Sequence, residues 1–187
     1  MQISSGLKML GGLIIQSSNG SPSPTGPYSP VQGSNYGYAS GGSTPSPNGN
    51  VLSDVIQKFS FSSDANATDV GNLTQSRLIA AGQSSTASGY TSGGRLSPPS
   101  VFSNVIDKFP FSSDGNATDV GDLTVTREIG SVGQSSSVSG YSSGGRNNSN
   151  TPEYLNVIDK FPFASDGNAT DVGDLISAFH SPTGQQY

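Results

Sequence analysis

The sequence contains no cysteine and no tryptophan, and only one histidine in 187 residues. Without cysteine, neither disulfides nor thiolate metal sites can form. Only 11% of the residues are charged, and Lys and Arg are scattered rather than gathered into the basic stripe that nucleic-acid binding requires. The longest apolar run, Met9 to Ile15, falls short of the roughly 20 residues of a membrane span. We therefore expect neither a nucleic-acid partner nor a membrane-spanning segment.

Residues for catalysis are also scarce. His180 is the only histidine, so no second histidine or cysteine can complete a nucleophile–base pair. Carboxylate pairs such as Asp119 and Asp122 recur along the chain, whereas a catalytic pair normally occurs once. No glycine-rich phosphate loop with its lysine is present. The sequence therefore predicts a protein that is not an enzyme.

What the chain does contain is a repeat. One twenty-residue pattern occurs three times, at Asp54 to Leu73, Asn104 to Leu123 and Asn156 to Leu175. A period of about fifty residues is typical of repeat architectures. So polar a chain would otherwise be expected to be disordered, but Phe, Val, Ile and Tyr recur at fixed places. We expect a folded β domain over residues 31–187.

Each repeat offers four candidate strands, which are residues 105–111, 119–125, 133–137 and 139–145 in the best-defined copy. Large apolar residues alternate in the first of them, as in a half-buried strand. Pro110 within it indicates a strand end or an edge, because proline cannot donate to a sheet ladder. The sequence predicts an all-β fold of three four-stranded antiparallel repeats.

The arrangement of these repeats is left open between several closed forms. Four short strands per repeat are typical of a propeller-like blade, but propellers usually have 4–8 blades. Three repeats could close within one chain or between chains, and a pseudo-threefold trefoil or prism is the alternative. Residues 33–42 resemble a fourth strand without the other three, and residues 176–187 could supply a third strand. We therefore predict that strand 33–42 completes the third repeat.

Residues 1–30 precede the repeats and differ from them in composition. Prolines, serines and glycines fill residues 18–30, and proline removes backbone donors and favours an extended chain. We interpret residues 1–30 as an extended arm or linker. Its apolar side chains are candidates for docking on a neighbouring subunit by strand addition. They are Leu10, Leu13, Ile14 and Ile15.

One loop of the repeat carries oxygen-bearing side chains at loop positions one, three, five and nine, the pattern that calcium prefers. The candidate ligands in the last two copies are Asp114, Asn116, Thr118 and Asp122, and Asp166, Asn168, Thr170 and Asp174. The alternative is an Asx-type turn, in which Asp and Asn side chains accept bonds from nearby backbone N–H groups. We favour the turn. Calcium-dependent melting that disappears in Asp114→Ala and Asp166→Ala would indicate calcium, the only cofactor that the sequence suggests.

Two further recurring residue types suggest structural roles. The recurring cations are expected to pair with repeat aspartates at the contacts between units, such as Asp69, Asp119 and Asp171. These cations are Lys58, Lys108, Lys160, Arg77, Arg127, Arg95 and Arg146. Tyrosines at 38, 90 and 141 recur at one place of the repeat, which favours packing between sheets over stacking on sugars.

The repeated wording Val-Ile-Asp-Lys-Phe-Pro-Phe, followed by Asp-x-Asn-Ala-Thr-Asp-Val-Gly-Asp-Leu, Gly-Gln-Ser-Ser and Gly-Tyr-x-Ser-Gly-Gly, resembles repeats of virion structural and tail-fibre-like proteins of marine tailed bacteriophages. The resemblance covers about residues 33–180 and includes likeness to kelch- or integrin-type β-propeller repeats. It implies localisation in the virion and a role in the phage particle, with other virion proteins as partners.

Two functions are compatible with this resemblance. In the first, the chain is a capsid decoration or tail-associated subunit, forms a homo-oligomer and docks through its N-terminal arm. In the second, it is a host-receptor or glycan-binding fibre module, since closed β-repeat folds present binding loops on one face. We favour the first, because copies two and three are nearly identical and lack a distinctive aromatic loop.

Overall fold

The structure is a computed structural model that describes residues 35–97, 101–128, 132–147, 153–179 and 182–185. Within these ranges every regular element is a β-strand, and every strand pairing is antiparallel. The predicted all-β class is therefore confirmed. The described residues include no helix long and apolar enough to cross a membrane.

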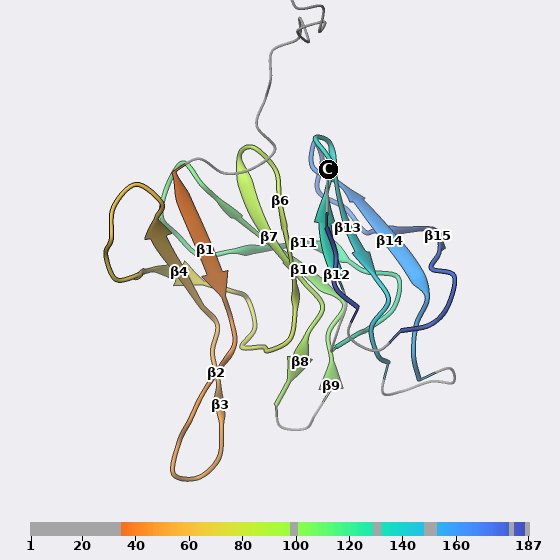
Figure 1. Ribbon diagram of the computed structural model, residues 1–187, viewed down its shortest axis with the longest axis horizontal. Helices are drawn as coiled ribbons and strands as arrows, with labels where there is room; N and C mark the ends of the chain where they lie inside the picture. Colours follow the sequence, from red (N-terminus) through yellow and green to blue (C-terminus); the bar gives the residue numbers. More distant parts are fainter. Residues whose placement is uncertain (1–34, 98–100, 129–131, 148–152, 180–181, 186–187) are drawn as a thin grey trace, which may run out of the picture.

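Three sheets follow one another along the chain (Figure 1). The first sheet has the order β1 (Tyr36–Ser40), β4 (Val55–Ser60), β5 (Thr68–Asn72). The second has the order β11 (Thr118–Asp122), β10 (Val105–Pro110), β7 (Ser88–Ser92), β6 (Ala81–Ser84). The third has the order β12 (Val132–Ser135), β13 (Ser139–Ser143), β14 (Val157–Pro162), β15 (Thr170–Asp174). Each sheet is an antiparallel meander.

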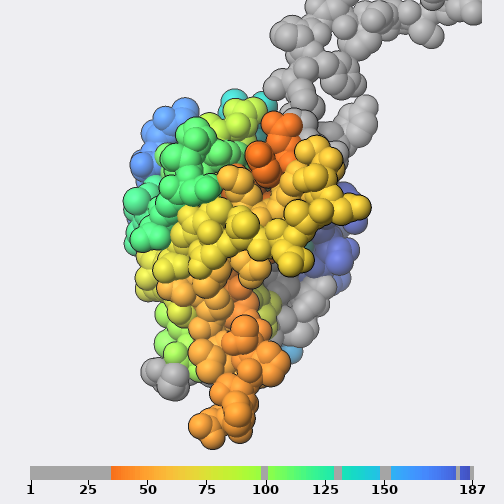
Figure 2. All heavy atoms as spheres, turned by 90° about the vertical axis from the view of Figure 1, so that its left-hand side faces the viewer, coloured from red at the N-terminus to blue at the C-terminus, as the bar shows by residue number. Residues whose placement is uncertain are grey.

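Two small hairpins extend from the connections between strands. They are β2 (Ser43–Thr44) with β3 (Val51–Leu52), and β8 (Arg95–Leu96) with β9 (Val101–Phe102). In the side view of Figure 2, the first sheet forms much of the near surface and the β2–β3 hairpin projects away from it. The hairpins thus lie apart from the three sheets.

All four predicted strands of the best-defined repeat are present as β10, β11, β12 and β13, within a few residues of the expected bounds. Pro110 ends β10, as its missing donor predicts. The grouping differs from the prediction, because each four-stranded sheet joins the last two strands of one sequence repeat to the first two of the next. Short connections bring these consecutive strands together.

The N-terminal strand is found in a different sheet from the one predicted. We expected strand 33–42 to complete the third repeat, but β1 pairs with β4, with Gly37 opposite Phe59. A Cβ at Gly37 would lie 2.3 Å from the Phe59 ring, so the glycine makes room for the aromatic side chain of the neighbouring strand. Gly89 and Gly140 do the same for Phe109 and Phe161. With β1 at its edge, the first sheet has three strands, whereas the second and third sheets have four.

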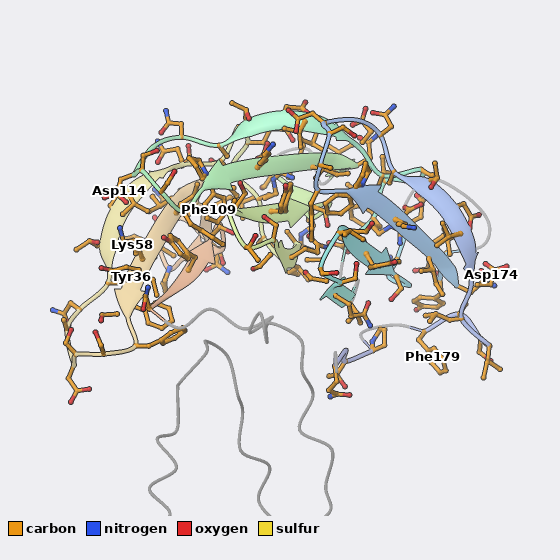
Figure 3. The ribbon with its side chains drawn as sticks, turned by 90° about the horizontal axis from the view of Figure 1, so that it is seen from above. Tyr36, Lys58, Phe109, Asp114, Asp174 and Phe179 are labelled. Atoms are coloured by element: carbon orange, nitrogen blue, oxygen red, sulfur yellow. The ribbon has the colours of Figure 1, made fainter. Side chains whose placement is uncertain are left out.

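Seen from above, the three sheets follow an arc (Figure 3). The described residues form neither a closed barrel nor a closed propeller, and no trefoil or prism closes within them. Residues 176–179 and 182–185, where a third-type strand was predicted, form no strand. The arc therefore has two ends, one at the first sheet and one at the third.

Candidate functional site

The candidate site is the pair of contacts between neighbouring sheets. We call the contact of the first and second sheets the first junction, and that of the second and third sheets the second junction. The same repeat positions build both. The first junction contains Tyr38, Ile56, Val70, Leu73, Phe109, Phe111 and Ala117. The second contains Tyr90, Ile106, Val120, Leu123, Phe161, Phe163 and Ala169.

Aromatic packing is repeated from one junction to the other. Tyr38 stacks on Phe111 with ring centroids 4.8 Å apart, and Tyr90 stacks on Phe163 at 4.9 Å. Offset-stacked rings at these distances stabilise a contact beyond the area that they bury. The prediction that Tyr38 and Tyr90 pack between sheets is confirmed. Tyr141 of β13 is half-buried, and no sheet follows the third one within the described residues.

A buried ion pair lies beside each apolar cluster. Arg77 Nη2 donates to Asp107 Oδ2 over 2.6 Å, and both side chains are 0% exposed. Arg127 and Asp159 form the same pair in the second junction. Each arginine also donates to backbone carbonyls, for example Arg77 to Gly93 and Val105, and each aspartate accepts from a threonine, Thr74 or Thr124. These extra bonds supply the partners that a buried ion pair requires.

Burial lowers the pKa of the Arg77 and Arg127 guanidinium groups, although Asp107 and Asp159 act in the opposite direction. Arginine nevertheless stays protonated in proteins. The arginines were predicted to pair with Asp69, Asp119 or Asp171, but their partners come from the central strands β10 and β14 instead. Those predicted aspartates each accept a bond from the backbone N–H two residues later, so their carboxylates are already used locally.

These local bonds lie at an irregularity of each sheet. The register shifts between Ile106 and Asp107, opposite Asp119 to Gly121, and Gly121 has a φ of +151°. A Cβ there would lie 2.3 Å from the Gly167 carbonyl oxygen of the next sheet. Glycine is therefore needed because the backbones of two sheets approach each other closely. The Asx-type turn that we favoured is found at Asp69, Asp119 and Asp171, outside the four loop positions proposed for calcium.

The loop residues proposed as calcium ligands connect one sheet to the next. Lys58 Nζ binds Asp114 Oδ1 over 2.8 Å, and Lys108 binds Asp166 in the same way. Asn116 and Asn168 accept bonds from the backbone N–H groups of Asn72 and Asp122. The hydrogen bonds with Asp114 and Asp166 raise the pKa of Lys58 and Lys108. Four of the proposed ligands thus join the sheets.

The other four proposed ligands, Thr118, Asp122, Thr170 and Asp174, lie in the strands β11 and β15 rather than in the loop. Among the described residues, no three Asp, Glu or His side chains gather into a group that could hold a metal ion. Calcium binding, the alternative to the turn that we favoured, stays a hypothesis, for which chelation is the test. The arm residues Leu10, Leu13, Ile14 and Ile15, and His180, lie outside the described residues.

A second charged cluster is formed around Glu128. Glu128 is 1% exposed and contacts Arg95 and Arg146, and Arg146 also contacts Glu153. The prediction that these two arginines pair with repeat aspartates is wrong, because their partners Glu128 and Glu153 lie outside the twenty-residue pattern. Sequence reasoning also did not identify the central Asp107 and Asp159 as the buried partners of the arginines. The signal that could have found them is that Gln57 replaces aspartate at the equivalent place in the first copy.

The chain matches no protein-family model and no curated protein. The two junctions consist of a set of charged, amide and aromatic side chains, repeated from sheet to sheet, whose contacts hold one sheet against the next. The arrangement is suited to building a stack or ring of sheets.

Proposed function

We propose that the chain is a non-enzymatic structural subunit of a tailed-phage virion, a capsid decoration or tail-associated protein that docks on other virion proteins through its N-terminal arm. The observation that supports this most is the use of the repeated polar side chains. Arg77, Asp107, Lys58, Asp114 and Asn116 all join one sheet to another. The polar side chains that recur in the pattern thus hold the sheets of the protein together, which favours a structural role.

The proposal extends to the finer architecture. The sheets are propeller-like blades, each a four-stranded antiparallel meander in the second and third sheets. They are placed along an arc by equivalent contacts. Equivalent contacts between successive units turn each unit by a similar amount, as in repeat proteins whose curvature follows from a small rotation per repeat. The arc then belongs to a ring that is closed by further sheets.

The experiment compares virions purified from two phage strains. In one strain the gene for this protein encodes the full chain, and in the other it encodes a chain lacking residues 1–30. Mass spectrometry of the particles should detect the full chain and lose the shortened one, while circular dichroism of the shortened protein still shows a folded β domain. A control chain in which a Gly/Ser sequence of equal length replaces residues 18–30 keeps the arm length and the docking side chains of residues 10–15, so it should still be found in the particles.

Two results would contradict parts of the proposal. Absence of the full chain from purified particles contradicts the virion role. Retention of the shortened chain contradicts docking through the arm. Specific binding of the isolated protein to a glycan array would favour the receptor-binding alternative.

A further inference from the structure

The two ends of the arc carry the two halves of a junction. Each internal junction joins a face with Tyr, Ile, Val and Leu to a face with two Phe and Ala. The first sheet presents the second kind of face, and the third sheet presents the first kind. We call them the first-sheet face, made of Phe59, Phe61, Asp64, Asn66 and Ala67, and the third-sheet face, made of Tyr141, Ile158, Lys160, Val172 and Leu175.

Apolar side chains on both faces are more exposed than the equivalent side chains in the internal junctions. Phe59 is 39% exposed and Phe61 is 56% exposed, whereas the equivalent Phe109 is 5% exposed. On the other face, Val172 is 51% exposed. Every residue of β15 is exposed, whereas the last three residues of β11 are partly covered. Clustered apolar side chains of this kind mark an interaction surface.

Charge and hydrogen-bonding groups are complementary between the faces. Lys58 and Lys108 bind the loop aspartates of the following sheet. Lys160 occupies the same repeat position and makes no ion pair within the described residues, while Asp64 holds the loop position on the first-sheet face. Asn66 likewise corresponds to Asn116 and Asn168, the side chains that accept a backbone N–H across each junction.

The buried ion pair of the internal junctions is replaced on both faces. Gln57 stands at the position of Asp107, and Phe179 stands at the position of Arg127. Joining the faces would therefore bury no arginine or aspartate without its partner, a situation that is strongly destabilising. The close approach of the two backbones is retained as well, because Gly173 of the third-sheet face matches Gly121. On the first-sheet face, Ala65 stands at the position of Gly115, where an added Cβ meets nothing within 4 Å.

The edge of the first sheet fits the same arrangement. β1 pairs only with β4, so its other edge lacks the strand that β6 and β12 provide in their sheets. Residues 182–185 lie against β12, where Gly184 is close enough to Val132 that a Cβ would meet Cγ1 at 1.8 Å. In the same way Gly133 of β12 lies against Gly82 of β6. Residues 182–185 thus occupy the place of an innermost strand for a following sheet.

We propose that a second copy of this chain covers both faces, with the third-sheet face of each copy against the first-sheet face of the other. Figure 3 shows the two ends of the arc opening toward the same side, with Tyr36 near one end and Phe179 near the other. A two-fold axis then makes two identical junctions and closes a ring of six sheets, within the 4–8 of propellers. Head-to-tail contacts give rings when their rotation closes.

In this dimer, residues 182–185 of one copy lie along the free edge of β1 in the other. The register of β12 with β13 places Gly133 opposite Ser142 and Gln134 opposite Tyr141. The same register places Gly184 opposite Ala39 and Gln185 opposite Tyr38 of the second copy. The first sheet thereby gains its fourth strand, and β-strand addition supplies backbone hydrogen bonds at the junction.

The inference deepens the ring closure proposed above and does not depend on the virion role. Mass photometry and analytical ultracentrifugation of the full chain should give twice the 19.0 kDa of one chain. Phe61→Asp should raise the dissociation constant by more than about a hundredfold, because each of the two junctions loses an aromatic anchor. Val51→Asp is the matched control, since Val51 is equally exposed, at 56%, but lies in the β2–β3 hairpin.

A charge exchange tests the orientation of the contact. Lys160→Glu sets Glu against Asp64 at both junctions, and Asp64→Lys sets two lysines together, so each variant alone should dissociate more readily than the wild type. Mixing the two variants creates one reversed Glu–Lys pair and one original Lys–Asp pair, so a mixed dimer should form. Circular dichroism establishes that every variant is folded.

Four results would contradict the dimer or the faces assigned to it. A wild-type mass of one chain at all concentrations would contradict self-association. Growth beyond two chains with concentration would contradict closure. A dimer that persists in Phe61→Asp, or a mixture of the charge variants that stays monomeric, would contradict the assigned faces. Loss of the protein from virions with the dimer intact would count against the virion role alone.

Discussion

Phe109 and Phe59 occupy the same place in the repeat, yet Phe109 is 5% exposed and Phe59 is 39% exposed. The difference lies in what covers them. Phe109 faces Tyr38 of the preceding sheet, with ring centroids 5.5 Å apart, whereas Phe59 has no preceding sheet in the described chain. The two internal junctions and the two end faces thus use one set of residues in two environments.

The comparison also shows where the repeat changes. Aromatic and aliphatic residues are kept at both ends, but the buried charges are not, since Gln57 and Phe179 replace the aspartate and the arginine. An apolar side chain can be partly exposed at little cost, whereas a charge that becomes buried without its partner is destabilising by several kcal/mol. The end faces therefore keep the apolar side chains, which are tolerated both when exposed in a single chain and when buried in a junction.

The largest effect is expected at the internal ion pair. Arg127→Met leaves Asp159 buried without its partner, which should lower the free energy of unfolding by about 3–5 kcal/mol. Adding Asp159→Leu should recover part of that loss, because both charges are then absent. Urea unfolding followed by circular dichroism measures both variants.

The matched change at the end face is Gln57→Asp in a chain kept monomeric by Phe61→Asp, where it adds a carboxylate at an exposed position and should alter stability by less than about 0.5 kcal/mol. A loss below about 1 kcal/mol in Arg127→Met would show that the internal pair is not what distinguishes the junctions from the ends.

A second comparison uses the two phenylalanines directly. Phe109→Ala removes a core aromatic side chain and should cost about 3–5 kcal/mol, whereas Phe59→Ala should cost clearly less in a chain that is kept monomeric by Phe61→Asp. Thermal melting at equal protein concentration compares the two. Equal losses would mean that Phe59 is as well covered within one chain as Phe109.

A third comparison concerns two equivalent glycines. A Cβ at Gly133 would lie 2.1 Å from the Gly82 carbonyl oxygen, whereas a Cβ at Gly82 meets nothing within 4 Å. Gly133→Ala should therefore destabilise the protein by about 1–3 kcal/mol through overpacking. In a chain kept monomeric by Phe61→Asp, Gly82→Ala should be neutral or slightly stabilising, because alanine reduces the freedom of the unfolded chain. The opposite order in urea unfolding would contradict the close contact of β6 and β12.

The strands were predictable because their signals are local. Alternating Val, Ile and Phe, Pro110 and the paired glycines indicate strand bounds without knowledge of the rest of the fold. The division into sheets was not predictable in this way, since a repeat can be cut at any phase. Only the pairings of β1 with β4, β7 with β10 and β13 with β14 show where each sheet begins. Repetition predicted the role of the tyrosines, because a repeated core needs the same side chain in each unit.

The partners of Arg77 and Arg127 were harder to predict. Every repeat supplies several aspartates, and sequence spacing does not show which of them lies on the covered side of a strand. Asp107 and Asp119 are opposite each other in register, but Asp107 is 0% exposed and Asp119 is exposed. The sheet–sheet contact makes this difference, and the contact exists only in three dimensions.

The smallest expected effect on stability is the difference between replacing Lys108 and replacing Lys160. The hydrogen bond with Asp166 raises the pKa of Lys108 above its ordinary 10.5. The charged form is thus favoured in the folded state, and its stabilising contribution is complete below pH 10.5 and is lost as the pH rises through the raised value. Because the pair is partly exposed, Lys108→Met should cost no more than about 1 kcal/mol near neutral pH.

In a Phe61→Asp background, which keeps the end faces apart, Lys160→Met should leave the melting temperature unchanged. Melting curves from pH 7 to pH 11 should show the Lys108→Met difference shrinking at the alkaline end. In the dimer, Lys160 meets Asp64 of the second copy, so Lys160→Met should then behave as Lys108→Met does. A Lys160 effect that is the same in both backgrounds would mean that the two lysines differ for a reason other than the missing neighbour.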